Sequence, residues 1–166
     1  MPAEAADLPA GGSPYHIALV CLGNICRSPM AEVVLTRKVA DAGLADRVVV
    51  RSAGTGDWHV GEPIDERAGA TLRGAGYDPS GHRAQQFGPG WLDHDLVLAM
   101  DAANLAGVRA LAGDDGRVRM FRDFDPQGPG EVPDPWYGGP DGFTEVLAMV
   151  ERTADALVVA LQRTLR

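Results

Sequence analysis

Residues 21–28 combine side chains that could bind a phosphate group and attack it. They read Cys-Leu-Gly-Asn-Ile-Cys-Arg-Ser, so five residues separate Cys21 from Arg27. A loop of this length can wrap so that successive backbone N–H groups point inward, and such a nest binds an anion. The planar guanidinium of Arg27 can hold two phosphate oxygens at once. The spacing therefore predicts a phosphate-binding loop that begins with a cysteine.

The positive field of such a loop would also activate the cysteine. A free thiol has a pKa of about 8.5, and a helix N-terminus or a nearby cation lowers that value by several units. Gly23 and Asn24 are residue types that tolerate the positive φ angles of a tight loop. We therefore predict that Cys21 is a nucleophile. The alternative is a buried structural cysteine at a strand end, which the register of Gly, Asn, Arg and Ser after it disfavours.

A leaving phenolate has a conjugate acid with a pKa of about 10, so a proton donor should help it leave. The Pro/Gly-rich loop 122–140 offers four carboxyl groups, on Asp123, Asp125, Glu131 and Asp134. We predict Asp134 as the acid because prolines on both sides stiffen the backbone there. Trp136 and Tyr137 follow and could line a slot for an aromatic ring. A solvated loop carboxylate beside buried aromatics is an equally open interpretation from composition alone.

Outside these two segments, the sequence offers weaker candidates for residues of the site. Trp58 lies in the Gly-rich segment 52–61, where it is expected to form a wall or a lid of the site. His59, His82 and His94 have no metal-ligand spacing, and His82 is expected to be a hydrogen-bonded structural residue. No metal and no cofactor are predicted.

Hydrophobic periodicity indicates the elements that position these residues. Buried strands are predicted at 16–21, 47–51, 96–100 and 118–121, and helices at 29–42, 64–75, 104–111 and 143–165. Ser28 is expected to cap the first helix, with Pro29 at its first position. Alternating strands and helices without hairpin signals predict a parallel sheet. Open parallel sheets bind ligands at the carboxyl ends of their strands, which is where Cys21 falls.

Composition excludes several classes of protein. The 166 residues fit one domain, predicted at 14–166 after a disordered tail at 1–13. The net charge of −8 and the absence of a basic run argue against nucleic acid and anionic membranes as partners. Two cysteines make no disulfide scaffold, and no signal peptide is expected. We expect a cytoplasmic protein with free thiols, although export without a signal peptide stays open.

The quoted segments resemble the low-molecular-weight protein tyrosine phosphatases, bacterial members in particular. The resembling segments are CLGNICRSPMAE (21–32), SAGTGDWHVG (52–61), HRAQQF (82–87), LAMDAANL (98–105) and DPWYGG (134–139). The resemblance implies a flavodoxin-like α/β fold with a four-stranded parallel sheet flanked by helices. It implies hydrolysis of phosphotyrosine in proteins, with Cys21 forming a cysteinyl-phosphate and Arg27 clamping the transition state. Asp134 would act first as general acid and then as general base.

The resemblance also implies supporting roles. Asn24, Ser28, Ser52 and His82 match a hydrogen-bond network that shapes the loop. Cys26 matches a second cysteine that can form a reversible disulfide with the nucleophile. The residues expected at the substrate are Leu22, Gly23, Asn24, Ile25, Cys26, Ser28, Trp58, Trp136 and Tyr137. Trp136 departs from the family, which usually has tyrosine there, and the tail 1–13 has no assigned counterpart.

Three other functions fit the sequence less well. A thiol-coupled arsenate reductase shares the fold and loop, but its relay needs further cysteines, and none follows Cys26. Protein-arginine phosphatases look to carry Thr at the position of Ile25, and Ile25 with the aromatic pair favours a phenyl ring. A catalytically dead phosphate-binding module is disfavoured by the joint presence of Cys21, Arg27 and Asp134. A monomer or weak self-association is expected.

Overall fold

The computed structural model describes residues 8–165, and the side chains of Tyr137 and Pro140 lie outside that description. At its centre is a parallel sheet with the strand order β2-β1-β3-β4. The strands are β1 (Tyr15–Cys21), β2 (Val48–Gly54), β3 (Leu96–Ala99) and β4 (Val118–Met120). The α-helices are α2 (Arg27–Asp41), α3 (Glu66–Gly74), α4 (Ala102–Ala112) and α5 (Pro140–Thr164). Short 3-10 helices are η1 (Pro89–Trp91), η2 (Phe121–Phe124) and η3 (Pro135–Tyr137). The predicted four-stranded α/β fold is thereby confirmed.

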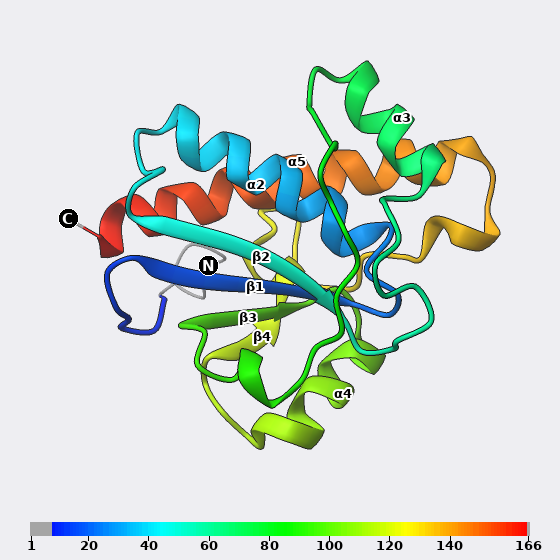
Figure 1. The fold of residues 1–166 in the computed structure, drawn as a ribbon. Coiled ribbons are helices and arrows are strands. Elements are labelled where there is room, and N and C mark those ends of the chain that lie inside the picture. The colour runs from blue at the N-terminus through cyan, green and yellow to red at the C-terminus, as the bar shows by residue number, and fades with distance from the viewer. Residues whose placement is uncertain (1–7, 166) are drawn as a thin grey trace.

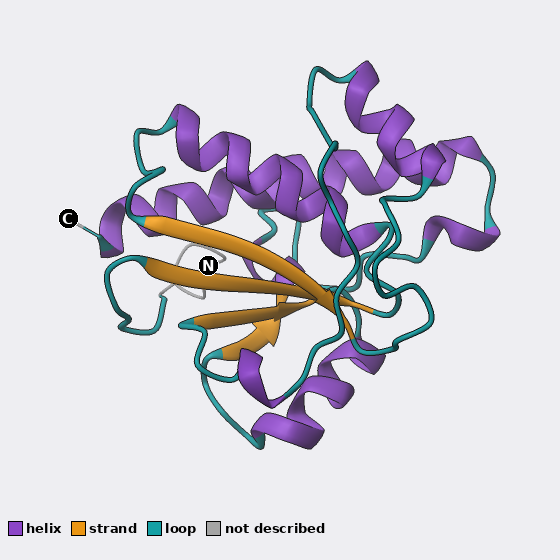
Figure 2. Ribbon diagram, viewed as in Figure 1, coloured by secondary structure: helices purple, strands orange, loops and turns teal. Residues whose placement is uncertain are grey.

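The helices cover both faces of the sheet (Figure 1). α2 and α5 lie over one face, and α4 lies over the other, as the colouring by secondary structure also shows (Figure 2). Side chains alternate along a strand, so β1 contributes to two cores. Ala18 and Val20 belong to the smaller core beneath α4, whereas Ile17 and Leu19 belong to the larger core beneath α2 and α5. None of the helices described is both long and apolar enough to cross a membrane.

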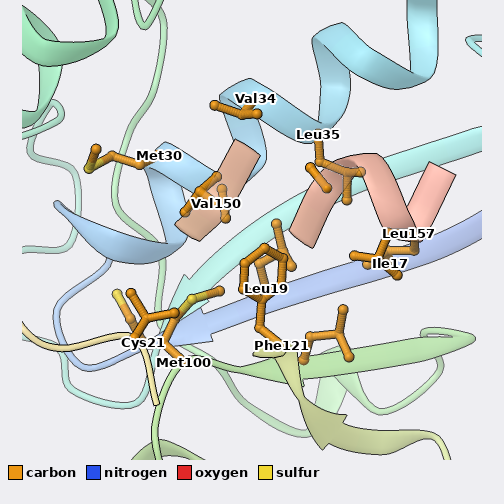
Figure 3. Packing of buried hydrophobic residues seen from close by; sticks show 14 of the residues in the cluster. Ile17, Leu19, Cys21, Met30, Val34, Leu35, Met100, Phe121, Val150 and Leu157 are labelled. Carbon is orange, nitrogen blue, oxygen red and sulfur yellow. The ribbon is translucent and has the colours of Figure 1, made fainter. Parts of the chain in front are cut away.

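Cys21 continues the buried row of β1. In Figure 3, Ile17, Leu19 and Cys21 follow one another along the strand, and Leu35 of α2 and Leu157 of α5 lie over the row. Each of these five side chains is at most 2% exposed. Burial of apolar surface stabilises a fold by about 25 cal/mol per Å². The packing that stabilises the sheet therefore also fixes the backbone of the candidate nucleophile.

The carboxyl ends of β1, β2 and β3 lie at one edge of the sheet. The register pairs Cys21 with Gly54 and Val20 with Ala99. Because β1 lies between β2 and β3, the strand order reverses across it, and open parallel sheets bind ligands at such a switch point. Residues that directly follow β1 and β3 are thus brought together.

Two predicted boundaries near the site were wrong. Ser28 was expected to cap the first helix, but α2 already begins at Arg27, and Cys26 precedes it without a side-chain cap. The hydroxyl of Ser28 is consequently directed to other partners. The second strand was expected to end at residue 51, yet β2 keeps pairing with β1 as far as Gly54. Ser52 therefore lies in a strand and not in a loop.

Two further features of the C-terminal part differ from the prediction. α5 begins at Pro140 and not at 143, because proline is favourable in the first turn of a helix. The loop predicted at 122–140 contains η3 and all of η2 except Phe121. Asp134 is the N-cap of η3, where its Oδ1 accepts a hydrogen bond from the backbone N–H of Trp136 at 3.0 Å. This cap gives the carboxylate a defined place in an otherwise irregular segment.

The segment before β1 contacts the domain. The Tyr15 hydroxyl donates to the Pro9 carbonyl at 2.9 Å, and the Gly12 N–H donates to Asp95 Oδ1 at 3.1 Å. Leu8 packs against the larger core. The rest of the predicted tail, residues 1–7, lies outside the described residues. These contacts are at the amino end of β1, opposite the end that carries Cys21.

Candidate active site

Residues 21–28, called the phosphate loop below, connect β1 to α2 in a tight turn. Asn24 has a φ of 58°, a left-handed conformation that asparagine tolerates better than most residues. Its backbone N–H points back to Cys21 Sγ at 3.3 Å. Ser28 Oγ lies 3.0 Å from the same sulfur. Gly54 lies against the loop, and a Cβ there would come within 2.7 Å of the Leu22 carbonyl oxygen. The loop therefore depends on glycine in the neighbouring strand.

The Asn24 side chain holds the phosphate loop from behind. Its Nδ2 donates to Ser28 Oγ and to Ser52 Oγ, each at 2.9 Å. Its Oδ1 accepts from the backbone N–H of Gln85 at 2.8 Å, which fixes the orientation of the amide. His82 Nε2 donates to the Asn24 carbonyl at 2.7 Å. The four residues expected to shape the loop are thus brought together, with Gln85 as an unpredicted fifth.

Glu32 sets the direction of these hydrogen bonds. An ionised carboxylate can only accept, so Ser52 donates its proton to Glu32 and must accept from Asn24. Ser28 likewise accepts from Asn24, which leaves the Ser28 proton for Cys21 Sγ in preference to the Ala53 carbonyl at 3.4 Å. A donated proton at 3.0 Å stabilises a thiolate. Glu32 was not predicted as part of the site, because nothing in its spacing links α2 to Ser52.

Arg27 is 3% exposed and connects the phosphate loop to two other segments. Its Nη1 donates to Asp101 Oδ2 at 2.7 Å and to the Val132 carbonyl at 3.1 Å. Its Nη2 lies 3.6 Å from Asp134 Oδ2. Burial lowers the pKa of Arg27, but the hydrogen bond to Asp101 and the negative charges nearby raise it more, so the net shift is upward. The guanidinium remains charged, with Nη2 directed toward the carboxylate of Asp134.

Asp101 was not predicted as a site residue, although its position in the sequence pointed to the site. It directly follows the third predicted strand, at the sheet edge that also carries Cys21. Asp101 also caps α4, where its Oδ1 accepts from the Asn104 N–H at 2.7 Å. The cap fixes the carboxylate that orients Arg27.

Of the four carboxyl groups considered as the acid, Asp134 is the one found in the wall of the pocket described next. Asp123 accepts from the Met120 N–H at 3.1 Å, and Glu131 accepts from the Ala102 N–H at 2.8 Å. Asp125 is 1% exposed and forms ion pairs with Arg122 and Arg152. The hydrogen bonds and ion pairs of these three carboxylates stabilise the conformation of the loop.

A pocket of about 260 Å³ opens above the phosphate loop. It is lined by Cys21, Leu22, Gly23, Ile25, Cys26, Arg27, Trp58, His59, Asp134 and Trp136. Leu22, Trp58 and Trp136 are exposed at its rim, whereas Ile25 is buried. The Tyr137 side chain lies outside the described residues. His59 was not predicted; it makes a hydrogen bond to Glu62 at 3.0 Å. The pocket therefore has a polar base at the phosphate loop and an apolar rim.

Cys26 differs from Cys21 in its surroundings. It is 6% exposed, and burial together with the negative charge of Asp65 raises the pKa of its thiol far above the ordinary value. The Cys26 thiol is therefore neutral at physiological pH. No group of three or more His, Cys, Asp or Glu side chains is placed to hold a metal ion within residues 8–165.

Comparison with known proteins places this geometry in a family. The family model for low molecular weight phosphotyrosine protein phosphatase matches residues 16–166. The chain belongs to that family. This phosphatase is 48% identical over 155 residues to the low molecular weight protein-tyrosine-phosphatase of Streptomyces coelicolor, and the match covers 89% of this chain and 94% of that protein. The chain is thus a protein-tyrosine-phosphatase, a hydrolase.

Solved structures agree with this assignment. The phosphatase aligns with YfkJ from Bacillus subtilis at a TM-score of 0.87 and 34% identity, over 93% of this chain and 99% of that one. It aligns with Wzb from Vibrio vulnificus, solved in complex with benzylphosphonate, at a TM-score of 0.78 and 25% identity. That alignment covers 88% of this chain and 98% of Wzb.

Proposed function

We propose that the phosphatase hydrolyses phosphotyrosine in proteins through a cysteinyl-phosphate on Cys21. The thiolate Sγ attacks phosphorus, the bond from phosphorus to the tyrosyl oxygen breaks, and Asp134 gives its proton to that oxygen. Asp134, now ionised, then takes a proton from a water molecule. The water oxygen attacks the cysteinyl-phosphate, and inorganic phosphate leaves with the thiolate restored. Charge on the equatorial oxygens is held by Arg27 Nη2 and the backbone N–H groups of the loop.

One observation supports the proposal most strongly. Cys21 Sγ lies within hydrogen-bond reach of both the Asn24 N–H and the Ser28 hydroxyl, at the base of a pocket that Asp134 also lines. The nucleophile, the anion-binding groups and the proton donor thus face one space. Asp134 is also 3.6 Å from Arg27, the residue that would hold the phosphate.

The upper pocket supports an aromatic substrate. Trp58 and Trp136 line it with exposed indole rings, and Ile25 adds a branched apolar surface beside the loop. Flat rings of this kind pack well against a phenyl group. Wzb from Vibrio vulnificus holds benzylphosphonate, which joins a phenyl ring to a phosphonate. A phosphotyrosine side chain has the same combination of groups.

Substrate choice can be tested by comparing kcat/KM for matched peptides that carry phosphotyrosine, phosphoserine or phosphoarginine, with arsenate reduction as a further assay. We expect phosphotyrosine to exceed each of the other two peptides by at least about 100-fold, since only its ring fills the aromatic slot. No reduction of arsenate is expected. Equal rates on the three peptides, or faster hydrolysis of phosphoarginine, would contradict the assignment.

Cys26 is proposed to protect Cys21 from over-oxidation. Both thiols line the same pocket, and the structure leaves both free. A sulfenic acid formed on Cys21 would condense with the Cys26 thiol, releasing water and forming a disulfide that a dithiol can reduce. We expect peroxide to inactivate the wild type reversibly and the Cys26→Ser variant irreversibly. Sulfonic acid on wild-type Cys21, without a disulfide in mass spectra, would overturn this role.

The remaining proposals concern the setting of the reaction. The substrates are phosphotyrosine-containing proteins of the cytoplasm, and the phosphatase acts as a monomer or in weak self-association. The net charge of −8 makes nucleic acid and anionic lipid unfavourable partners.

A further inference from the structure

Arg67, outside the pocket lining, contacts the segment that carries the proposed acid. Its Nη1 donates to the Trp136 carbonyl at 3.2 Å. Its guanidinium carbon lies 4.9 Å from the centre of a Trp136 ring and 4.8 Å from that of Phe143. A cation over an aromatic face is attracted by the ring, most strongly by tryptophan. Arg67 therefore holds Trp136 both by its backbone and by its ring.

Asp65 fixes the position of this guanidinium. Its Oδ1 accepts from Arg67 Nε at 3.3 Å, and its Oδ2 accepts from Arg67 Nη2 at 3.2 Å. The backbone N–H of Asp65 donates to the Ile25 carbonyl at 2.9 Å. Asp65 also caps α3, so it is tied to a regular element. A continuous path thus runs from the phosphate loop through Asp65 and Arg67 to Trp136.

Trp136 connects this path to Asp134. The Trp136 N–H donates to Asp134 Oδ1, while the Trp136 carbonyl accepts from Arg67. The backbone of Trp136 therefore links Arg67, bound at its carbonyl, to the carboxylate of Asp134, bound at its N–H. A change in the Trp136 backbone would move Asp134 directly.

Substrate binding makes this link important. Asp134 Oδ2 lies 3.6 Å from Arg27 Nη2, whereas Arg27 Nη1 donates to Asp101 and Val132. Asp101 and Val132 hold neither Nε nor Nη2 in the described residues, and a bound phosphate would compete with Asp134 for Nη2. The contacts of Arg67 do not involve the phosphate-binding groups and would persist.

We propose that Arg67 is a positioning residue that keeps Asp134 and Trp136 in place once Arg27 has engaged the phosphate. This inference rests on the proposed function, because it assumes that Asp134 is the general acid. Arg67 is exposed, although its guanidinium lies over the Phe143 ring of the core, so a replacement should keep a long side chain at that contact.

The test compares the variants Arg67→Met, Arg67→Lys and Arg73→Met, the last being a matched control because Arg73 is also exposed on α3. Arg67→Met is expected to lower kcat/KM for phenyl phosphate by about 10-fold and for 4-nitrophenyl phosphate by less than about 3-fold, because only the poorer leaving group depends strongly on the acid. Arg67→Lys should recover part of the loss, since it keeps a cation over Trp136. Inhibition by inorganic phosphate and the melting temperature should not change.

A double variant separates this proposal from the assignment of the acid. With Asp134→Asn already present, Arg67→Met should cause no further loss that depends on the leaving group. If Asp134→Asn alone slowed both substrates equally, the acid assignment would fail. If Asp134→Asn showed the expected dependence but Arg67→Met slowed both substrates equally or neither, only the positioning role would be overturned. Equal effects of Arg67→Met and Arg73→Met would overturn it as well.

Discussion

Cys21→Ser is expected to reduce turnover of phosphotyrosine by at least about 10⁴-fold while phosphate binding persists, because the variant loses only the nucleophile. A serine hydroxyl is not ionised at neutral pH, and within residues 8–165 the hydrogen-bond partners of the Cys21 sulfur are Ser28 Oγ and the Asn24 N–H, neither of which is a base. The anion-binding groups, Arg27 and the backbone N–H groups, are unchanged by the substitution. Turnover is measured with a phosphotyrosine peptide, and binding of inorganic phosphate by calorimetry.

Cys26→Ser is the matched control for this variant. It changes a thiol in the same pocket to the same hydroxyl, but the Cys26 thiol has a raised pKa and is not the proposed nucleophile. We expect its turnover to stay within about 10-fold of the wild type, as for a substitution that removes no reacting group. Turnover by Cys21→Ser at a comparable rate would contradict a covalent role for Cys21.

Asp134→Asn is expected to slow hydrolysis of phenyl phosphate by about 10³-fold, the usual range for loss of a general acid. Asparagine keeps the size of the side chain and an oxygen that can accept from the Trp136 N–H, so η3 should keep its cap. It cannot donate a proton to a phenolate. An aryl phosphate with a more acidic phenol should lose much less in kcat/KM, because its oxygen leaves without help.

Glu131→Gln provides the comparison for Asp134→Asn. Glu131 lies in the same loop, and its carboxylate accepts from the N–H of Ala102 instead of facing the pocket. We expect no dependence of its effect on the leaving group. Equal losses for good and poor leaving groups with Asp134→Asn would mean that another residue is the acid.

Local sequence was sufficient to predict that β1, the phosphate loop and α2 follow one another as one unit, but it placed the start of α2 two residues too late. Cys21, Asn24 and Arg27 are close in the chain, so their meeting requires only a tight turn between a strand and a helix. The placement of Asp134 in the pocket was harder to foresee, because about 110 residues separate it from Cys21. Two flanking prolines and two following aromatic residues were the signal, and resemblance to a family strengthened it.

The residues that were not predicted form contacts between segments that are far apart in the sequence. Asp101 reaches Arg27 only because β3 lies next to β1, and Glu32 reaches Ser52 only because α2 lies over β2. Arg67 reaches Trp136 across 69 positions of the chain. No local pattern encodes such pairs. The prediction for Ser28 was wrong for a related reason. Serine before proline is typical of a helix cap, but the Ser28 hydroxyl instead forms hydrogen bonds with Cys21 Sγ and Asn24 Nδ2 in the phosphate loop.

The most direct test of the central claim is mass spectrometry of the phosphatase quenched with acid during turnover of a phosphotyrosine peptide. We expect one phosphoryl group on the proteolytic fragment that contains Cys21, localised to Cys21 and not to Cys26. The Cys21→Ser variant should carry no phosphoryl group under the same conditions. A phosphoryl group on another residue, or complete turnover by Cys21→Ser, would rule out a cysteinyl-phosphate on Cys21.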